Sequence, residues 1–144
     1  MIILDAYAVL ALLKGEPAAQ LVAELLDVDD EARLTALGVA EVVDHLVRLV
    51  GSSEDDAALD IAQLGLADAV QVDSALAMQS GLLRARHYHR RHRAVSLADC
   101  VAAETARTHL AALATADPHL LDLCYHEAID RMVLPDSTGS LWSH

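Results

Sequence analysis

The sequence is poor in aromatic residues, cysteines and long apolar runs. Aromatic residues make up 3% of the 144 residues and phenylalanine is absent, so a binding surface of stacked rings, as in many single-strand nucleic-acid modules, is not expected. Two cysteines, Cys100 and Cys124, can form neither a disulfide framework nor a four-thiolate zinc site, and we interpret both as buried thiols. The longest charge-free run, Ser74–Leu83, is about half a membrane span, and no basic leader precedes Asp5. We therefore expect a cytoplasmic protein that does not insert into a membrane.

Positive charge is also scarce, and it is unevenly distributed. Ten Lys and Arg face 22 Asp and Glu, a formal net charge of −12, which disfavours generic attraction to phosphate backbones. Half of the basic residues nevertheless form one arginine strip, with three histidines between them: Arg84, Arg86, Arg90, Arg91 and Arg93. The strip is either a solvated helix face or a phosphate-binding element. The eight histidines show no zinc-like H-x-x-x-H spacing with matching thiols.

The apolar residues, 54% of the chain, suffice for the core of one domain spanning residues 1–144, with a polar tail over about 136–144. Apolar runs predict strands at Met1–Asp5, Arg33–Thr35, Ala67–Val72 and Ala111–Thr115, with an edge strand near Val133–Pro135. Helical periodicity and end signals predict helices at Ala6–Lys14, Pro17–Leu26, Gly38–Val50, Ser74–His89 and Ser96–Thr108, and two more that open at Ser52–Asp60 and at Asp117-Pro118. Short strands alternating with helices indicate an α/β fold with a mostly parallel sheet.

Four carboxylates stand among apolar neighbours and are candidates for one site. Asp5 ends the first predicted strand, Asp117 follows the last clear one, Glu41 lies within a helix and Asp99 opens another. Sites in open parallel sheets form at the carboxyl ends of strands. Two like charges ~4 Å apart repel by about 4 kcal/mol at an effective dielectric near 20, so such a cluster requires a cation. All-oxygen ligands favour Mg²⁺ or Mn²⁺.

Each of these acids also has a structural interpretation. Asp5 and Asp117 can cap the helices that follow them, and Asp99 stands three residues after Ser96, which is the spacing of a capping box. Glu41 lies mid-helix at the edge of the apolar face, where no capping role exists and the alternative is a solvent-facing acid.

The order of these motifs resembles that of PIN domains, and in particular of the VapC-type toxins of bacterial toxin–antitoxin pairs. The matching segments are MIILDAYAVLALLKGEP, VAEVVDHL, SLADCVAAETA and LATADPHL, which span most of the chain from Met1 to about Leu121. The resemblance implies a three-layer α/β/α sandwich with a central, mostly parallel sheet of four to five strands. It also implies a metal-dependent endoribonuclease that uses Mg²⁺, with Mn²⁺ as a substitute, to activate water against RNA, with tRNA as one candidate.

Carried over position by position, the resemblance makes Asp5, Glu41, Asp99 and Asp117 the catalytic and metal-binding acids. Thr115 matches the small hydroxyl residue two positions before the fourth acid. Many relatives place Ser or Thr directly after the first acid, whereas this chain has Ala6, so the supporting hydroxyl contact is either absent or supplied by Tyr7. The arginine strip is the candidate RNA-binding element.

The expected partners are a cognate VapB-like antitoxin, the RNA substrate and a second copy of the chain. The apolar helices Ala6–Lys14 and Gly38–Val50 could supply the protein contacts, although core burial explains them equally well. Two alternatives stay open, a catalytically silent PIN-fold binding module and a DNA-directed nuclease. A third, a receiver-like phosphoacceptor, is disfavoured. The last needs a lysine at a strand end, and the only lysine is Lys14, in the first predicted helix.

Overall fold

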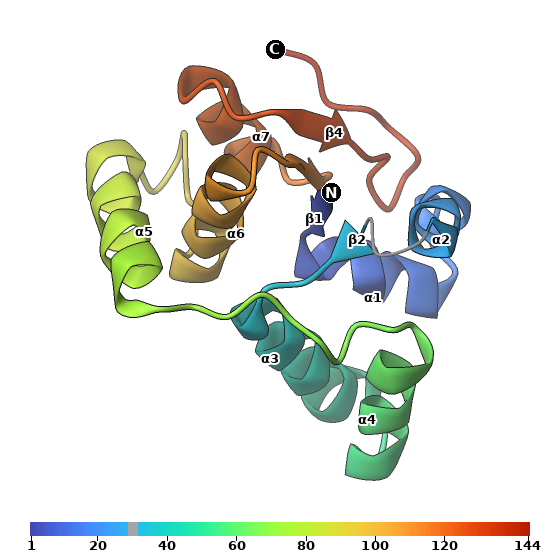
Figure 1. Ribbon diagram of the computed structural model, residues 1–144. Helices are drawn as coiled ribbons and strands as arrows, with labels where there is room; N and C mark the ends of the chain where they lie inside the picture. Colours follow the sequence, from blue (N-terminus) through green and yellow to red (C-terminus); the bar gives the residue numbers. More distant parts are fainter. Residues whose placement is uncertain (29–31) are drawn as a thin grey trace.

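The computed structural model describes residues 1–28 and 32–144 and shows a central sheet of four parallel strands in the order β2-β1-β3-β4 (Figure 1). This confirms the predicted parallel α/β sheet. The strands are β1 (Ile2–Leu4), β2 (Ala32–Arg33), β3 (Ala112–Thr115) and β4 (Arg131–Val133).

All the α-helices in the described chain except α2 begin where a short polar side chain accepts a hydrogen bond from a first-turn amide. Asp5, Thr35, Ser53, Asp73, Ser96 and Asp117 fill this capping role. A π-helical turn, η1 (Leu46–Val50), continues α3 directly and ends at Gly51, whose φ of 85° suits glycine. The helices are α1 (Ala6–Lys14), α2 (Ala19–Asp27), α3 (Ala36–His45), α4 (Glu54–Gln63), α5 (Ser74–His87), α6 (Leu97–Thr108) and α7 (Pro118–His126).

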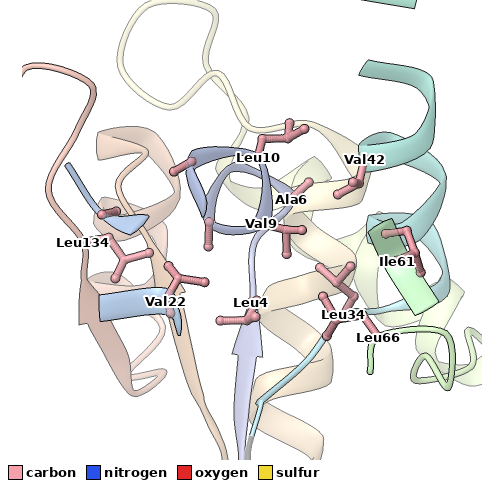
Figure 2. Close-up of a cluster of buried hydrophobic side chains, with 14 of the residues drawn as sticks. Leu4, Ala6, Val9, Leu10, Val22, Leu34, Val42, Ile61, Leu66 and Leu134 are labelled. Carbon is pink, nitrogen blue, oxygen red and sulfur yellow. The ribbon is translucent and has the colours of Figure 1, made fainter. Parts of the chain in front are cut away.

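Two hydrophobic clusters cover opposite faces of the sheet, because consecutive strand residues point to opposite sides. Leu4 and Ala114 belong to the cluster formed with α1–α4, part of which is drawn in Figure 2. Ile3 and Leu113 belong to the cluster formed with α5, α6 and α7. The arrangement is the expected three-layer α/β/α sandwich. Cys100 and Cys124 are buried free thiols in the second cluster, as expected.

The predicted strand Ala67–Val72 is wrong. This segment joins α4 to α5, and only Val70 pairs with another strand segment, through a single parallel bridge to Thr35. The N–H of Val70 donates to the Leu34 carbonyl, and Val70 accepts from the N–H of Ala36. Because the chain enters α3 directly after Thr35, it offers too few extended residues for a fifth strand. The alternation of apolar residues reflects only the insertion of Val70 into the core.

Several boundaries also differ from the predictions. The helix predicted from Pro17 begins at Ala19, and the helix predicted to His89 ends at His87, because Tyr88 adopts an extended ψ of 130°. The edge strand lies at Arg131–Val133, slightly before its predicted position. None of the helices in residues 1–28 and 32–144 has both the length and the apolar character needed to cross a bilayer.

Candidate active site

The topology brings the predicted acids to one edge of the sheet. Asp5 directly follows β1, and Asp117 stands two residues after the carboxyl end of the neighbouring parallel strand β3. Helix α6 leads into the amino end of β3, so its own first turn, with Asp99, lies toward the carboxyl edge. Helix α3 leaves the same edge after β2 and carries Glu41 in its second turn.

All four acids line a single open pocket of about 600 Å³. Asp5, Asp99 and Asp117 are partly buried in it, and Glu41 stands on its exposed rim. Four acids separated by up to 112 positions in sequence therefore converge, as predicted. None of them forms an ion pair with a basic side chain in the part of the chain that the structure describes.

One hydroxyl group links two of these acids. Thr115 Oγ1 donates to Asp5 Oδ2 at 2.6 Å and accepts from the Asp117 N–H at 3.1 Å. The other oxygen of Asp5 accepts from the Tyr7 N–H at 3.2 Å, which is the cap of α1. The Tyr7 hydroxyl instead donates to the Pro135 carbonyl at 2.9 Å. Thr115, and not Tyr7, therefore supplies the hydroxyl that contacts the first acid.

The capping interpretation of Asp99 and Asp117 also holds. Asp99 Oδ2 accepts from the Ser96 N–H at 2.8 Å, and Ser96 Oγ accepts from the Asp99 N–H at 3.0 Å, which completes a capping box. Asp117 Oδ1 accepts from the N–H of His119, after Pro118 at the first position of α7. Capping fixes these carboxylates in place while one oxygen of each stays available to the pocket.

Crowding of these acids in a partly dry pocket raises their pKa values. Burial is the largest cause for Asp5, whose pKa rises to about 6 against the opposing hydrogen bond from Thr115, with Asp99 and Asp117 adding repulsion. Loss of water around the Glu41 carboxyl, followed by repulsion from Asp5 and Asp99, raises its pKa to about 7. Burial also raises the pKa of Asp99. The pocket thus holds excess negative charge that a cation would relieve.

The pocket also contains basic residues that the sequence did not reveal as part of the site. One face of α3 and η1 contributes His45 and Arg48, and the end of α1 contributes Lys14. Arg48 pairs with Asp44 at 2.9 Å and Lys14 with Glu16 at 3.4 Å. Only the helical spacing from Glu41 to Arg48, seven residues, could have indicated that both share one face.

The tail after β4 completes one wall of the pocket. Asp136 and Ser137 line it, next to the Pro135 carbonyl that accepts from Tyr7. The expected polar tail of residues 136–144 therefore begins as part of the site. Sequence gave no signal for this, because the tail reaches the pocket through tertiary contact alone.

The donor set suits a hard divalent cation. Carboxylate oxygens dominate the pocket, and no thiol lines it among the described residues. No three of these carboxylates in the described chain bring ligand oxygens within 4.8 Å of one another. A cation that retains several of its own waters fits such an open arrangement, and Mg²⁺ usually does so. Asp5, Asp99, Asp117 and Glu41 are the residues placed to hold it.

The arginine strip lies outside this pocket, and three of its members have partners within the chain. Arg84 Nε donates to the Val95 carbonyl at 2.9 Å, Arg86 pairs with Glu127 at 3.5 Å, and Arg93 pairs with Asp122 at 2.9 Å. The remaining two, Arg90 and Arg91, are exposed on the turn between α5 and α6.

The chain was compared with known families, curated sequences and solved structures. A family model described as PIN domain matches residues 2–124, whereas no curated protein sequence matches. The fold is similar to that of FitAcB from Neisseria gonorrhoeae, with a TM-score of 0.67, 19% identity and coverage of 92% of this chain and 96% of that one.

Two further structures share the fold. A toxin–antitoxin complex from Klebsiella pneumoniae has a TM-score of 0.60 at 18% identity, over 81% of this chain and 87% of that one. VapBC2 from Rickettsia felis bound to a promoter DNA fragment has a TM-score of 0.67 at 15% identity, over 92% and 98%. Together with the family match over most of its length, the fold and the four-acid pocket establish that this chain belongs to the PIN-domain family.

Proposed function

We propose that the chain is a divalent-metal-dependent endoribonuclease and the toxin of a VapBC-type toxin–antitoxin pair. The observation that carries this proposal is the convergence of Asp5, Glu41, Asp99 and Asp117 in one pocket, where no basic side chain of residues 1–28 or 32–144 forms an ion pair with them. PIN domains are generally nucleases that use divalent metals, and two of the similar structures are described as a toxin–antitoxin complex and as VapBC2.

Three of the acids are fixed in position and serve as ligands. Asp5 is oriented by Thr115 and the Tyr7 N–H, Asp99 by its capping box and Asp117 by the first turn of α7. When bound, Mg²⁺ supplies a water of lowered pKa and offsets the charge that develops on the phosphoryl oxygens. Mn²⁺ would serve as a substitute because it accepts the same oxygen ligands.

Glu41 has the properties of a proton acceptor. It stands on the exposed rim of the pocket, where its carboxylate oxygens can take a proton from the attacking water. The same carboxylate can also contribute to holding the metal. Its pKa of about 7 belongs to the pocket without a cation, and a bound metal would lower that pKa.

The substrate must reach an acidic pocket in a protein of net charge −12. The exposed pair Arg90 and Arg91 is the part of the strip that is available for phosphates, while Arg84, Arg86 and Arg93 would shape the turn that carries them. Because the overall field repels RNA, recognition should depend on the shape of a folded RNA, such as tRNA, more than on general affinity.

The antitoxin and a second copy of the chain are the proposed protein partners. The apolar residues of α1 are mostly buried in the core, so that helix offers little free surface. The end of η1 differs, because Leu49 and Val50 are 60% and 50% exposed. A VapB-like antitoxin could also place a basic side chain among the pocket acids, where it would neutralise the charge that otherwise binds metal.

The test is cleavage of a folded RNA and of single-stranded DNA of the same sequence, each with Mg²⁺ and with EDTA. We expect Mg²⁺-dependent cleavage of RNA that Asp99→Asn abolishes. Glu16→Gln is the matched control, because Glu16 lines the same pocket but pairs with Lys14. Cleavage of DNA alone would replace the proposal with a DNA-directed nuclease, and no cleavage of either would leave a binding module.

A further inference from the structure

A second cluster of potential metal ligands lies on α7, outside the acidic pocket. Asp122 and His126 stand four residues apart on one face of this helix, and the tail returns to place His144 beside them. The ligand atoms of the three residues all lie within 4.8 Å of one another. Asp122 is partly buried, whereas both histidines are exposed, so a solvated ion can reach them.

The spacing of these atoms fits a small tetrahedral ion. Ligand atoms about 2.0–2.1 Å from zinc at tetrahedral angles are roughly 3.3–3.4 Å apart. Asp122 Oδ1 lies 3.4 Å from His126 Nε2 and 3.6 Å from His144 Nε2. Both Asp122–histidine distances therefore lie within a few tenths of an ångström of the separation that zinc needs, and the two imidazole nitrogens lie within 4.8 Å of each other. Small side-chain movements would bring the three atoms to three ligand positions and leave the fourth for water.

Neighbouring side chains hold two of the three ligands, Asp122 and His144, in this orientation. Arg93 Nε and its terminal nitrogen bind the other oxygen of Asp122, Oδ2, each at 2.9 Å, so Oδ1 faces the two imidazoles. The His144 ring stacks on Tyr125 with centroids 3.9 Å apart, and the Trp142 ring lies 5.9 Å from it. Arg131 sits over both Tyr125 and Trp142. Such outer contacts orient ligands in natural metal sites.

We propose that Asp122, His126 and His144 form a transition-metal site of the zinc class that fastens the tail to α7. Imidazole nitrogens favour such ions, whereas the carboxylate oxygens of the acidic pocket favour Mg²⁺, so the two sites would select different metals. The fastened segment is the one whose other end, at Asp136 and Ser137, lines the acidic pocket. Without metal, the cluster consists of contacts between Asp122 and the two histidines.

The single tryptophan of the chain provides the test, because Trp142 lies next to His144. Co²⁺ is titrated into the full chain in excess Mg²⁺, which occupies the oxygen pocket, and Trp142 fluorescence is followed. We expect saturable quenching by one equivalent that Zn²⁺ reverses by displacing Co²⁺. His126→Ala, which leaves Trp142 and His144 in place, should weaken binding at least ~10-fold, since the loss of even an outer contact typically costs about 10–100-fold.

Two control variants distinguish Co²⁺ binding at this site from Co²⁺ binding at other acidic or histidine side chains. Asp5→Asn and His92→Ala, which alter the acidic pocket and an exposed histidine of the turn after α5, should leave Co²⁺ binding unchanged. His144→Ala should weaken it as His126→Ala does. Equal Co²⁺ affinity in the parent, His126→Ala and His144→Ala would overturn the proposal, as would loss of binding in Asp5→Asn.

Discussion

The acids of the pocket and the acids at the far end of α7 show two opposite ways of placing negative charge in one small protein. Glu127 contacts Arg86, His87 and Arg107. Burial alone would raise its pKa, but hydrogen bonds with His87 and Arg107 and their charges outweigh burial and hold the pKa at about 2. Asp5 forms no ion pair with a basic side chain among the described residues, and burial raises its pKa to about 6.

The difference indicates which acids serve the fold and which serve a ligand. A carboxylate that is paired with basic side chains stabilises the folded chain at neutral pH. A partly buried carboxylate without such a partner destabilises the folded chain when it ionises. That cost is offset only when something positive binds. The pocket acids are thus kept at the expense of stability, as expected for a functional site.

When one acid is replaced in each of the two regions, the largest expected difference is in the rate of RNA cleavage. Asp99→Asn should lower RNA cleavage at least ~100-fold, because substitution of even an outer-shell contact to a metal costs about 10–100-fold. Glu127→Gln, in the other region, should cleave near the parent rate at a temperature where both are folded. Initial rates in Mg²⁺ provide the comparison, and equal losses in both variants would remove the distinction between the regions.

The second effect is on the pH dependence of metal binding. Below its pKa of about 6, Asp5 is protonated and proton and metal compete for the same oxygens. Mg²⁺ affinity, measured by calorimetry, should fall at least about 10-fold between pH 7 and pH 5, since the ionised fraction of a group with this pKa falls by that factor and protonation of Glu41, with a pKa of about 7, adds to the loss. An affinity that stays constant over this range would show that Asp5 is not a ligand.

The third effect is on stability at the paired region. The folded-state pKa of Glu127, about 2, lies below its ordinary value of 4.5, so its stabilisation is present above pH 4.5 and is lost as pH falls toward 2. Glu127→Gln should lower the free energy of unfolding by about 1–3 kcal/mol at pH 7, allowing for partial solvent screening. Urea titrations at pH 7 and pH 3 should show this loss shrinking in acid.

The opposite sign is expected at the pocket. The folded-state pKa of Asp5 lies above its ordinary value of 3.8, so the stabilisation from its protonated form is present below pH 3.8 and is lost as pH rises through 6. Without metal, Asp5→Asn should therefore stabilise the chain by about 1–3 kcal/mol at pH 8 and by little at pH 4. Added Mg²⁺ should stabilise the parent by binding to its pocket, and should therefore reduce the difference in unfolding free energy between the variant and the parent. Destabilisation by Asp5→Asn at pH 8 would contradict this account.

The smallest effect concerns the arginine strip. Replacing Arg90 and Arg91 by alanine should weaken RNA binding and reduce the slope of log affinity against log salt by about 1.4–1.8, since each of the two phosphate contacts contributes roughly 0.7–0.9. Arg33→Ala, on the separate segment β2, serves as the control. Unchanged affinity over a salt series would remove the strip from RNA recognition.

The sequence predicted those features that depend on local signals. The bounds of α1 follow from Asp5 as a cap and Gly15 as a left-handed end, and the strand-end positions of Asp5 and Asp117 predict that they meet at one edge of a parallel sheet. Glu41 could be assigned from its resemblance to the family and from its lack of a capping role, and it lines the same pocket.

The features that sequence could not predict depend on tertiary contact. Val70 looked like part of a strand, but a single bridge to Thr35 is all that the short edge of the sheet allows. Lys14 and Arg48 reach the pocket because α1 and α3 pack side by side, and the tail reaches it through Tyr7 and Pro135. His144 contacts Asp122 of α7 although the two residues are far apart in sequence, and no helical or strand spacing predicts such a contact.

The central claim is that four carboxylates form one divalent-metal site, and crystals grown with Mn²⁺ would test it most directly. The account predicts an anomalous-scattering peak in the pocket, within ~2.5 Å of a carboxylate oxygen of Asp5 and of at least one of Asp99 and Asp117. A peak found only beside Asp122 and His126, or a pocket that binds no Mn²⁺ at saturating concentration, would contradict it.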